Sequence, residues 1–213
     1  QIFGATKSGS GYYGTSAKQV QDGGYIVCGG THFTQSVLFG MTPSDIYEDE
    51  GFGSVSTNPC GEIILSPYDS CRLMLVNLTS FVKNPWTAEA SFDYGHFRII
   101  VKKAQRLMDD MIDLEVEQID KILAKIDSDP ETDEVKYYER SLWHKIRQVA
   151  LNGRRTGLGV TGLGDAIAML NQTYGSEDSI QTTEEIYKWL SLASYEESVL
   201  LAKERGAFPI FDL

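Results

Sequence analysis

The chain contains 213 residues, of which 42% are hydrophobic and 23% are charged, as expected for a folded globular protein. A formal net charge of −11 argues against nonspecific nucleic-acid binding, which requires lysine and arginine clustered on one surface. No apolar run reaches the ~18 residues of a membrane span and no basic and apolar leader opens the chain, so we expect a cytoplasmic protein that does not bind membranes. Three cysteines, an odd number, do not make the disulfide framework of a secreted protein.

The first forty or so residues differ from the rest of the chain in composition. They are rich in glycine, serine, threonine and tyrosine, and a turn signal at Asp22, Gly23 and Gly24 separates two short β-prone runs. This pattern predicts a β-hairpin or edge strands. We therefore divide the chain into a β-rich segment of unassigned origin at residues 1–41 and a second region at residues 42–213.

Three helices are predicted in the middle of the chain. Apolar side chains recur at a spacing of three and four over residues 94–115, which is typical of a long amphipathic helix, and again over 116–126, where a second short helix is expected. The acidic loop around Pro130 ends that helix. The third helix is expected from residue 135, and an Asn-Gly pair at 152–153 suits a left-handed turn at its C-terminus.

A last helix and three short strands complete the predicted elements. A capping box formed by Thr182 and Glu185 indicates where the last helix begins, and Gly206 lies past its end. The β-prone runs occupy residues 62–65, 72–81 and 156–163. Because long helices separate these runs, we expect an α/β fold with parallel strand pairing.

Residues 157–162 have the G-x-G-x-x-G pattern of dinucleotide-binding folds. That motif requires a hydrophobic strand that runs into the first glycine and a helix that opens at the last, so that the pyrophosphate meets free N–H groups. Here the preceding residues, LNGRRT, are polar and follow a predicted helix closely. We keep an NAD(P)-binding oxidoreductase as an alternative, although glycines inside a strand more often mark the close approach of a neighbour or ligand.

The cysteines and histidines do not have the spacing of a metal site. Cys60 and Cys71 are eleven residues apart and Cys28 lies far upstream, so there is no C-x₂₋₄-C pair, and no metal is expected. A Cys–His–Asn hydrolase triad stays open but has no local signature. A third alternative is a non-enzymatic acidic interaction module that binds through its β-rich segment. The histidines, expected at the surface or in helix packing, are His32, His96 and His144.

The segment Asn58-Pro59-Cys60-Gly61-Glu62 gathers groups suited to one substrate. In an extended segment, positions 58, 60 and 62 point the same way, so an amide, a thiol and a carboxylate would face one pocket. The proline and the glycine shape the loop, and glycine lets the backbone come close to a ligand. A buried packing cysteine in a tight loop is the alternative that these residues alone leave open.

Three segments resemble the catalytic chains of the ribonucleotide reductase family. STNPCGEIILSPYDSCRLMLVNLTSFV is similar to their active-site loop, most of all in the adenosylcobalamin-dependent class II enzymes, and NGRRTGLGVTGLGDAIAML and AKERGAFPIFD follow in the family's order. The resemblance covers residues 43–213. It implies part of a ten-stranded α/β barrel with long flanking helices, preceded here by the short β-rich segment. It also implies the reduction of ribonucleoside di- or triphosphates by thiyl-radical chemistry.

The resemblance implies roles for individual residues. Cys60 would become a thiyl radical that abstracts the 3′ hydrogen atom of the ribonucleotide. Glu62 would take the 3′-hydroxyl proton as a general base, and Asn58 would orient the ribose hydroxyls. Cys71 would be one half of the dithiol that reduces the 2′ position. The residues assigned to substrate binding are Ser56, Thr57 and Gly61.

Cofactor and partners follow from the same resemblance. It implies adenosylcobalamin as the cofactor, or a radical-generating subunit if the enzyme is class I, together with a thioredoxin-like reductant and a homo-oligomeric full-length enzyme. Cys28 has a sequence setting unlike that of the family's second redox cysteine, so we expect it to be a packing residue. Residues 1–41 do not resemble the family, and its phosphate-binding loop and C-terminal cysteine pair are missing. We therefore expect a fragment of the catalytic chain that is inactive alone.

Overall fold

A computed structural model of the chain describes backbone elements at residues 2–3, 13–19, 25–30 and 56–57, and then residues 64–70 and 72–212. Side chains are described for residues 65–70 and 72–211. The chain divides into two compact units. The first consists of residues 1–71 with 148–150 and 213, and the second of residues 72–147 with 151–212. The boundary that composition indicates near residue 41 stays a prediction.

The first unit contains short antiparallel strands. β1 (Ile2–Phe3), β2 (Tyr13–Gln19) and β3 (Tyr25–Gly30) form one sheet in the order β1-β2-β3. β2 and β3 pair antiparallel, as predicted for two strands that flank the Asp-Gly-Gly turn signal. β4 (Ser56–Thr57) pairs antiparallel with β5 (Ile64–Leu65), so the parallel pairing expected for the run at 62–65 is wrong.

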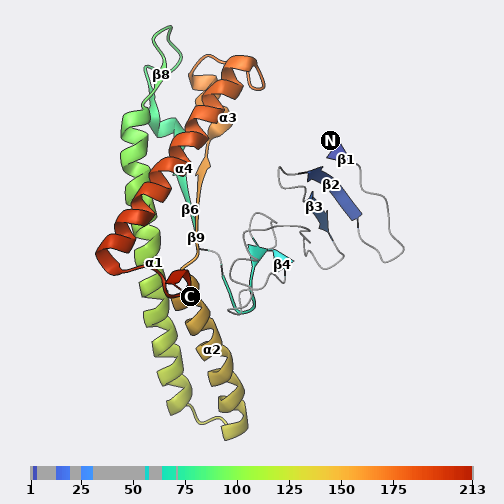
Figure 1. Ribbon diagram of the computed structural model, residues 1–213, viewed down its shortest axis with the longest axis vertical. Helices are drawn as coiled ribbons and strands as arrows, with labels where there is room; N and C mark the ends of the chain where they lie inside the picture. The colour runs from blue at the N-terminus through green and yellow to red at the C-terminus, as the bar shows by residue number, and fades with distance from the viewer. Residues whose placement is uncertain are drawn as a thin grey trace. The chain divides into compact units, whose positions relative to one another are not determined.

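A parallel pair of strands forms the sheet of the second unit. β6 (Arg72–Asn77) and β9 (Thr156–Thr161) pair with Arg72 opposite Thr156 and Asn77 opposite Thr161. The two strands lie side by side in Figure 1. This pairing confirms the prediction of parallel strands joined by a long helical connection.

Both strands are shorter than predicted. β6 ends at Asn77, whose side chain accepts hydrogen bonds from the N–H and the hydroxyl of Thr79 and so starts the 3₁₀ turn η2 (Leu78–Phe81). β9 ends at Thr161 because Gly162 adopts a φ of 74° and begins the short helix α3 (Leu163–Met169). Two further strands, β7 (Val82–Lys83) and β8 (Ser91–Phe92), follow η2 and pair antiparallel.

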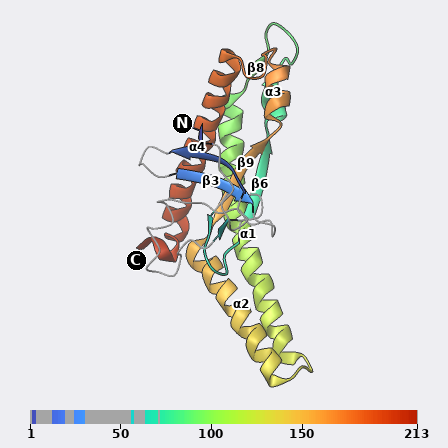
Figure 2. The same cartoon turned by 90° about the vertical axis from the view of Figure 1, so that its right-hand side faces the viewer.

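One long helix organises the second unit. α1 (Tyr94–Ser128) is continuous over 35 residues, so the predicted division into two helices is wrong. No glycine or proline lies between the two apolar repeats, and nothing interrupts the helical hydrogen bonds. α4 (Glu177–Arg205) lies along the first part of α1, and α2 (Asp133–Gly153) runs back along its second part (Figure 1 and Figure 2). The last described element is the 3₁₀ turn η3 (Pro209–Asp212).

The helix ends differ in part from the predicted caps. Ser176 is the N-cap of α4, because its hydroxyl accepts a hydrogen bond from the N–H of Ser179, so the predicted capping box at residue 182 lies inside the helix. After α2, the residue with a positive φ is Arg154, at 41°, and not the Asn-Gly pair. Gly206 follows α4 with a φ of 88°, as predicted for a residue past the helix end.

The hydrophobic core lies where α1, α4 and η2 meet. Phe81, Phe92 and Phe97 pack with ring centroids 5.1 to 6.0 Å apart, and Phe97 has no exposed surface. These tilted and edge-to-face contacts are the arrangement that aromatic rings prefer. The other buried members of the core are Val76, Leu78, Val101, Ala104, Ala166, Ile186, Leu190 and Ala193.

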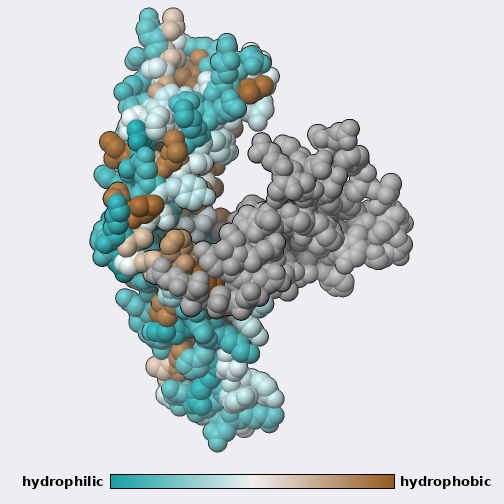
Figure 3. Space-filling model, viewed as in Figure 1, coloured by the Kyte–Doolittle hydropathy of each residue, from teal (hydrophilic) through white to brown (hydrophobic). Residues whose placement is uncertain are grey.

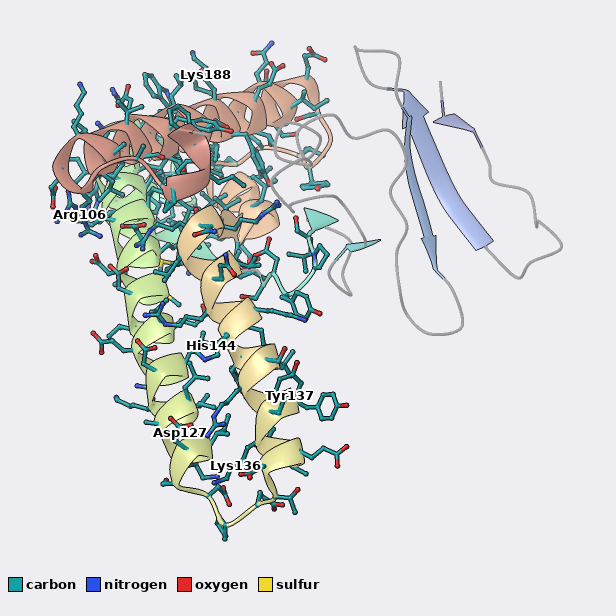
Figure 4. The ribbon with its side chains drawn as sticks, turned by 60° about the horizontal axis from the view of Figure 1, so that its bottom comes forward. Arg106, Asp127, Lys136, Tyr137, His144 and Lys188 are labelled. Atoms are coloured by element: carbon teal, nitrogen blue, oxygen red, sulfur yellow. The ribbon has the colours of Figure 1, made fainter. Side chains whose placement is uncertain are left out.

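Ion pairs connect α1 and α2 along their hairpin. Arg140 and Arg147 on α2 bind Asp127 and Asp120 on α1, at 2.6 and 2.7 Å. Figure 4 shows Asp127 and Lys136 at the closed end of the hairpin, where the Lys136 Nζ donates to the Asp127 carbonyl oxygen at 3.2 Å. Because these pairs are exposed to solvent, each contributes little to stability.

Among the residues that the structure describes, helix covers one face of the strand pair. α1 packs on the face that carries Met74 and Val76. On the opposite face Leu73 and Leu75 are 52% and 60% exposed. The described residues therefore confirm an α/β arrangement. They contain one parallel strand pair and no closed barrel, and the ten-stranded barrel of which the chain is expected to form part stays a prediction.

We predict that Gly162→Ala lowers the free energy of unfolding by about 1–3 kcal/mol, because residues other than glycine are strained at its φ of 74°. An added Cβ would also lie 2.9 Å from the Asn77 Oδ1 and 3.2 Å from the Thr79 Cγ2. Urea unfolding of the chain measures the loss. The matched control is Gly164→Ala, where a Cβ would meet nothing within 4 Å. Equal effects of the two substitutions would contradict the prediction.

Candidate functional site

Most residues that the sequence assigns to chemistry lie outside the described part of the chain. These are Asn58, Cys60, Gly61, Glu62 and Cys71. Ser56 and Thr57 form β4, and Cys28 lies in β3, each described as backbone only. The roles of these residues stay predictions. The structure describes the scaffold that follows Cys71 in the chain.

The face of β6 and β9 opposite α1 carries two exposed leucines and two glycines. Leu73 lies opposite Gly157 and Leu75 lies opposite Gly159, so leucine side chains from one strand border positions without side chains on the other. A Cβ at Gly159 would lie 3.0 Å from the Leu75 Cδ2, which confirms that this glycine permits a close approach. Neither pair has a group that could transfer a proton or bind a metal, so this face can exclude water but cannot catalyse by itself.

The G-x-G-x-x-G segment does not have the geometry of a dinucleotide site. Gly157 and Gly159 lie inside β9, whereas the motif needs a strand that ends at the first glycine. A helix does begin after Gly162, but it has only seven residues. The alternative of an NAD(P)-binding oxidoreductase therefore finds no support in the described residues.

A buried ion pair holds the start of β6 on α1. Arg72 is 7% exposed, and its guanidinium donates two hydrogen bonds to Glu115, from Nε to Oε2 at 2.5 Å and from Nη2 to Oε1 at 2.9 Å. Sequence reasoning missed this contact. A signal was present, because period two places Arg72 on the same face of the strand as Met74 and Val76, where an apolar residue is expected.

A second polar bridge holds the start of β9. The Gln105 side chain is 8% exposed and donates from Nε2 to the Thr156 hydroxyl at 3.1 Å. Its Oε1 accepts a hydrogen bond from the Ser194 hydroxyl of α4 at 2.9 Å. Both atoms of the amide therefore have partners, and one side chain of α1 connects a strand to a neighbouring helix.

Arg154, two residues before β9, closes a charged cluster on α1. Arg154 donates to Asp109 Oδ1 at 2.8 Å and to Asp113 Oδ1 at 2.7 Å. Burial acts to lower the pKa of the Arg154 guanidinium, but these hydrogen bonds outweigh it and raise that pKa above its usual value. Arg205 at the end of α4 binds Asp109 and Asp110, at 2.6 and 2.7 Å. The cluster therefore joins β9, α1 and α4.

The same three aspartates are a group of carboxylates close enough to share a cation. Each residue offers one carboxylate oxygen, and these three oxygens, from Asp109, Asp110 and Asp113, lie within 4.8 Å of one another. Because Arg154 and Arg205 already balance these charges, the arrangement suits a structural ion-pair network better than a metal site.

The described histidines are placed as packing and surface residues. The His96 ring contacts the Phe81 ring with centroids 5.4 Å apart. His144 is an exposed residue of α2, and its side chain is labelled in Figure 4. These positions agree with the sequence expectation for both residues.

The described surface is mainly hydrophilic. Figure 3 shows hydrophilic residues over most of one face of the helices, with separate hydrophobic patches. In the part of the chain that the structure describes, no helix combines the length and the apolar character needed to cross a membrane.

Comparison with protein families identifies the whole of the second unit and the residues just before it. Residues 51–213 match the model of a family described as "Ribonucleotide reductase, barrel domain". The matched stretch includes the N-x-C-x-E segment and Cys71 as well as β6, α1 and β9.

Curated relatives carry names that agree with this match. A "Vitamin B12-dependent ribonucleoside-diphosphate reductase" of Mycobacterium tuberculosis is 30% identical over 156 residues, which are 73% of this chain and 18% of the relative. A protein with the same name from Thermoplasma acidophilum is 30% identical over 154 residues, 72% of this chain and 16% of the relative. A "Ribonucleoside-diphosphate reductase large subunit" of African swine fever virus is 30% identical over 155 residues, with 73% and 16% covered. The chain thus spans less than a fifth of the length of these relatives.

Proposed function

Because the chain belongs to the ribonucleotide reductase family, in which it matches the barrel domain, we propose that it supplies the radical-bearing part of an enzyme that reduces ribonucleotides. The observation that carries this proposal is that the match, at residues 51–213, contains the complete N-x-C-x-E segment and Cys71. The pair of β6 and β9 supports it, because parallel strands with helix on one face are the repeating unit of an α/β barrel.

The proposed reaction uses two thiols in different roles. Cys60, as a thiyl radical, takes the 3′ hydrogen atom of the substrate, and Glu62 takes the 3′-hydroxyl proton while Asn58 orients the ribose hydroxyls. The 2′-hydroxyl takes a proton from the dithiol formed by Cys71 and a second thiol, and it leaves as water. The dithiol then supplies two electrons and its remaining proton to C2′ and becomes a disulfide. Glu62 returns its proton to the 3′-oxygen, and the hydrogen atom returns from Cys60 to C3′, which regenerates the thiyl radical. In this proposal Ser56, Thr57 and the backbone at Gly61 contact the substrate.

Adenosylcobalamin is part of the proposal because two of the relatives are named as vitamin B12-dependent. The described residues do not fit this group. The uncovered strand face has no nitrogen ligand, and a cavity of about 820 Å³ is lined by the paired Arg154 and Arg205 and by no histidine. When bound, the cofactor would supply the initial radical; no step in the chemistry of the described residues depends on it.

The remaining elements of the proposal concern the whole enzyme. We propose a ribonucleoside di- or triphosphate as substrate, a thioredoxin-like dithiol as reductant, a cytoplasmic location and a homo-oligomer. A radical-generating subunit would replace cobalamin if the enzyme resembles the viral large subunit more than the B12-dependent relatives.

A chimera tests the proposed function. Residues 51–213 replace the matched segment of the Mycobacterium tuberculosis relative, and ribonucleoside diphosphate reduction is measured with adenosylcobalamin and a dithiol. We expect turnover by the chimera and none by the 213-residue chain alone, since the chain covers only 18% of the relative. Circular dichroism establishes that the chimera is folded. A folded chimera that binds nucleotide but does not turn over would contradict the proposal.

A further inference from the structure

We propose that residues 134–145 of α2 carry a contact surface for a second copy of this chain, which packs its own α2 antiparallel to the first. The inference rests on the proposed function in one respect, the homo-oligomer, for which it names a surface. The residues that carry it belong to the second compact unit, and the structure describes their side chains.

α2 turns one charged side toward α1. Lys136, Arg140 and Arg147 bind Asp127 and Asp120 of α1, and Figure 4 shows Lys136 and Asp127 at the closed end of the hairpin. Because a helix turns by about 100° per residue, these three basic positions lie within about 40° of one another around the axis of α2. The opposite side of α2 therefore points away from α1.

The side of α2 that points away from α1 carries an apolar stripe. Val135, Tyr138 and Leu142 recur at spacings of three and four, roughly 150° around the helix from the basic side chains. Their exposed fractions are 40%, 65% and 45%. The rings of Tyr137 and Tyr138 pack edge to face with centroids 5.5 Å apart, so each limits the rotation of the other. Since an apolar stripe on a helix ordinarily packs on another element, its exposure indicates a partner outside the described residues.

The charges beside this stripe favour a second copy as that partner. Glu134 and Lys145 lie along the same edge of the stripe, eleven positions apart, with Tyr138 and Leu142 between them. When two copies of α2 pack antiparallel about the midpoint of residues 134–145, Glu134 of each copy faces Lys145 of the other. Tyr138 of each copy then packs on Leu142 of the other. The surface is therefore complementary to itself under a two-fold axis, as a symmetric dimer contact requires.

One charge opposes this arrangement and limits its strength. Glu139 lies along the other edge of the stripe, close to the proposed two-fold axis, so the Glu139 carboxylates of the two copies approach each other. The contact segment is also only about 17 Å long, which places the buried surface at the low end of what specific interfaces bury. We therefore expect a weak and reversible dimer.

The test measures the mass of the 213-residue chain by analytical ultracentrifugation between about 1 and about 200 µM, with a reductant that prevents disulfides between copies. We expect monomer at the low end and dimer at the high end. Glu134→Lys and Lys145→Glu are each expected to weaken the dimer about tenfold, because each substitution brings two pairs of like charges together. An equimolar mixture of the two variants is expected to form dimer again, since each lysine of one variant then faces a glutamate of the other.

Two leucine variants separate this surface from the strand face opposite α1. Leu142 and Leu75 are 45% and 60% exposed, so replacing either by lysine removes little core packing. Leu142→Lys is expected to abolish the dimer at about 200 µM, whereas Leu75→Lys is expected to leave it unchanged. Glu139→Gln removes the repulsion near the two-fold axis and is expected to strengthen the dimer about threefold. Circular dichroism establishes that each variant is folded.

Three results would overturn the proposal: a monomer at every concentration, a dimer that Leu142→Lys leaves intact, or a mixture of the two charge variants that stays monomeric. A dimer that Leu75→Lys alone weakens would place the contact on the strand face and would also overturn it. Turnover does not enter these measurements. A chimera without activity would count against the proposed function and leave this dimer standing, and an active chimera would not rescue a chain that stays monomeric.

Discussion

Replacing Cys60 by alanine in the chimeric reductase is expected to reduce turnover by roughly 10³-fold or more, because no other group of the N-x-C-x-E segment can transfer a hydrogen atom. Asn58 and Glu62 can orient the substrate and accept a proton, but neither has a bond to hydrogen weak enough to be exchanged with carbon. The measurement is deoxyribonucleotide formed per enzyme, with adenosylcobalamin and a dithiol in excess.

Two other cysteine variants serve as controls for Cys60. Cys28 lies in the β-rich segment, which the chimera omits, so its replacement is tested in the intact chain and is expected to leave folding unchanged. Cys71→Ala is expected to stop repeated turnover but to leave substrate binding unchanged, because only the reducing dithiol is lost. If the Cys60→Ala chimera kept its turnover, the radical role of Cys60 would be wrong even though the family assignment would stand.

The largest expected loss of stability comes from Phe97→Ala. Phe97 has no exposed surface and its ring lies 5.1 Å from the ring of Phe81 and 5.5 Å from that of Phe92. Removing it leaves a cavity where α1, η2 and β8 meet, and we expect the free energy of unfolding to fall by about 3–5 kcal/mol. Urea denaturation of the chain measures this loss.

Leu107→Ala on the same helix is the control for Phe97→Ala. Leu107 is 51% exposed, so its truncation is expected to change stability by no more than about 0.5 kcal/mol. Both variants introduce alanine into α1. They therefore differ in the burial of the side chain that is removed and not in the helix propensity of the new residue. A similar loss in both variants would show that the described core does not account for the stability of the second unit.

The elements of the second unit follow largely from local pattern. The apolar repeat with Phe97 and Val101 predicts the buried face of α1, and the β-prone runs around Leu75 and Val160 predict the two strands. The prediction was wrong where two local signals compete. Thr182 and Glu185 have the spacing of a capping box, but Ser176, six residues before Thr182, is the N-cap, and the box then lies in the helix interior.

The candidate site was also predicted only in part. The motif around Cys60 was recognised because its residues are consecutive, and its chemistry can be stated from residue types alone. The anchors of β6 and β9 were not recognised, since each joins residues far apart in sequence: Arg72 and Glu115 are 43 positions apart, and Gln105 and Thr156 are 51 apart. A pattern within a short stretch of sequence cannot indicate a contact between residues so far apart.

The reductase family, the N-x-C-x-E segment and the positions of most helices could be predicted from the amino-acid sequence, because each depends on residues close together in the chain. Parallel pairing was also predicted, but the register of β6 against β9 and the contacts of α1 with Arg72 and Arg154 became known only from the folded chain. The physical reason is that a buried charge must be balanced wherever the fold brings it, and the partner is chosen by packing across the sheet and helix, not by neighbours in the sequence.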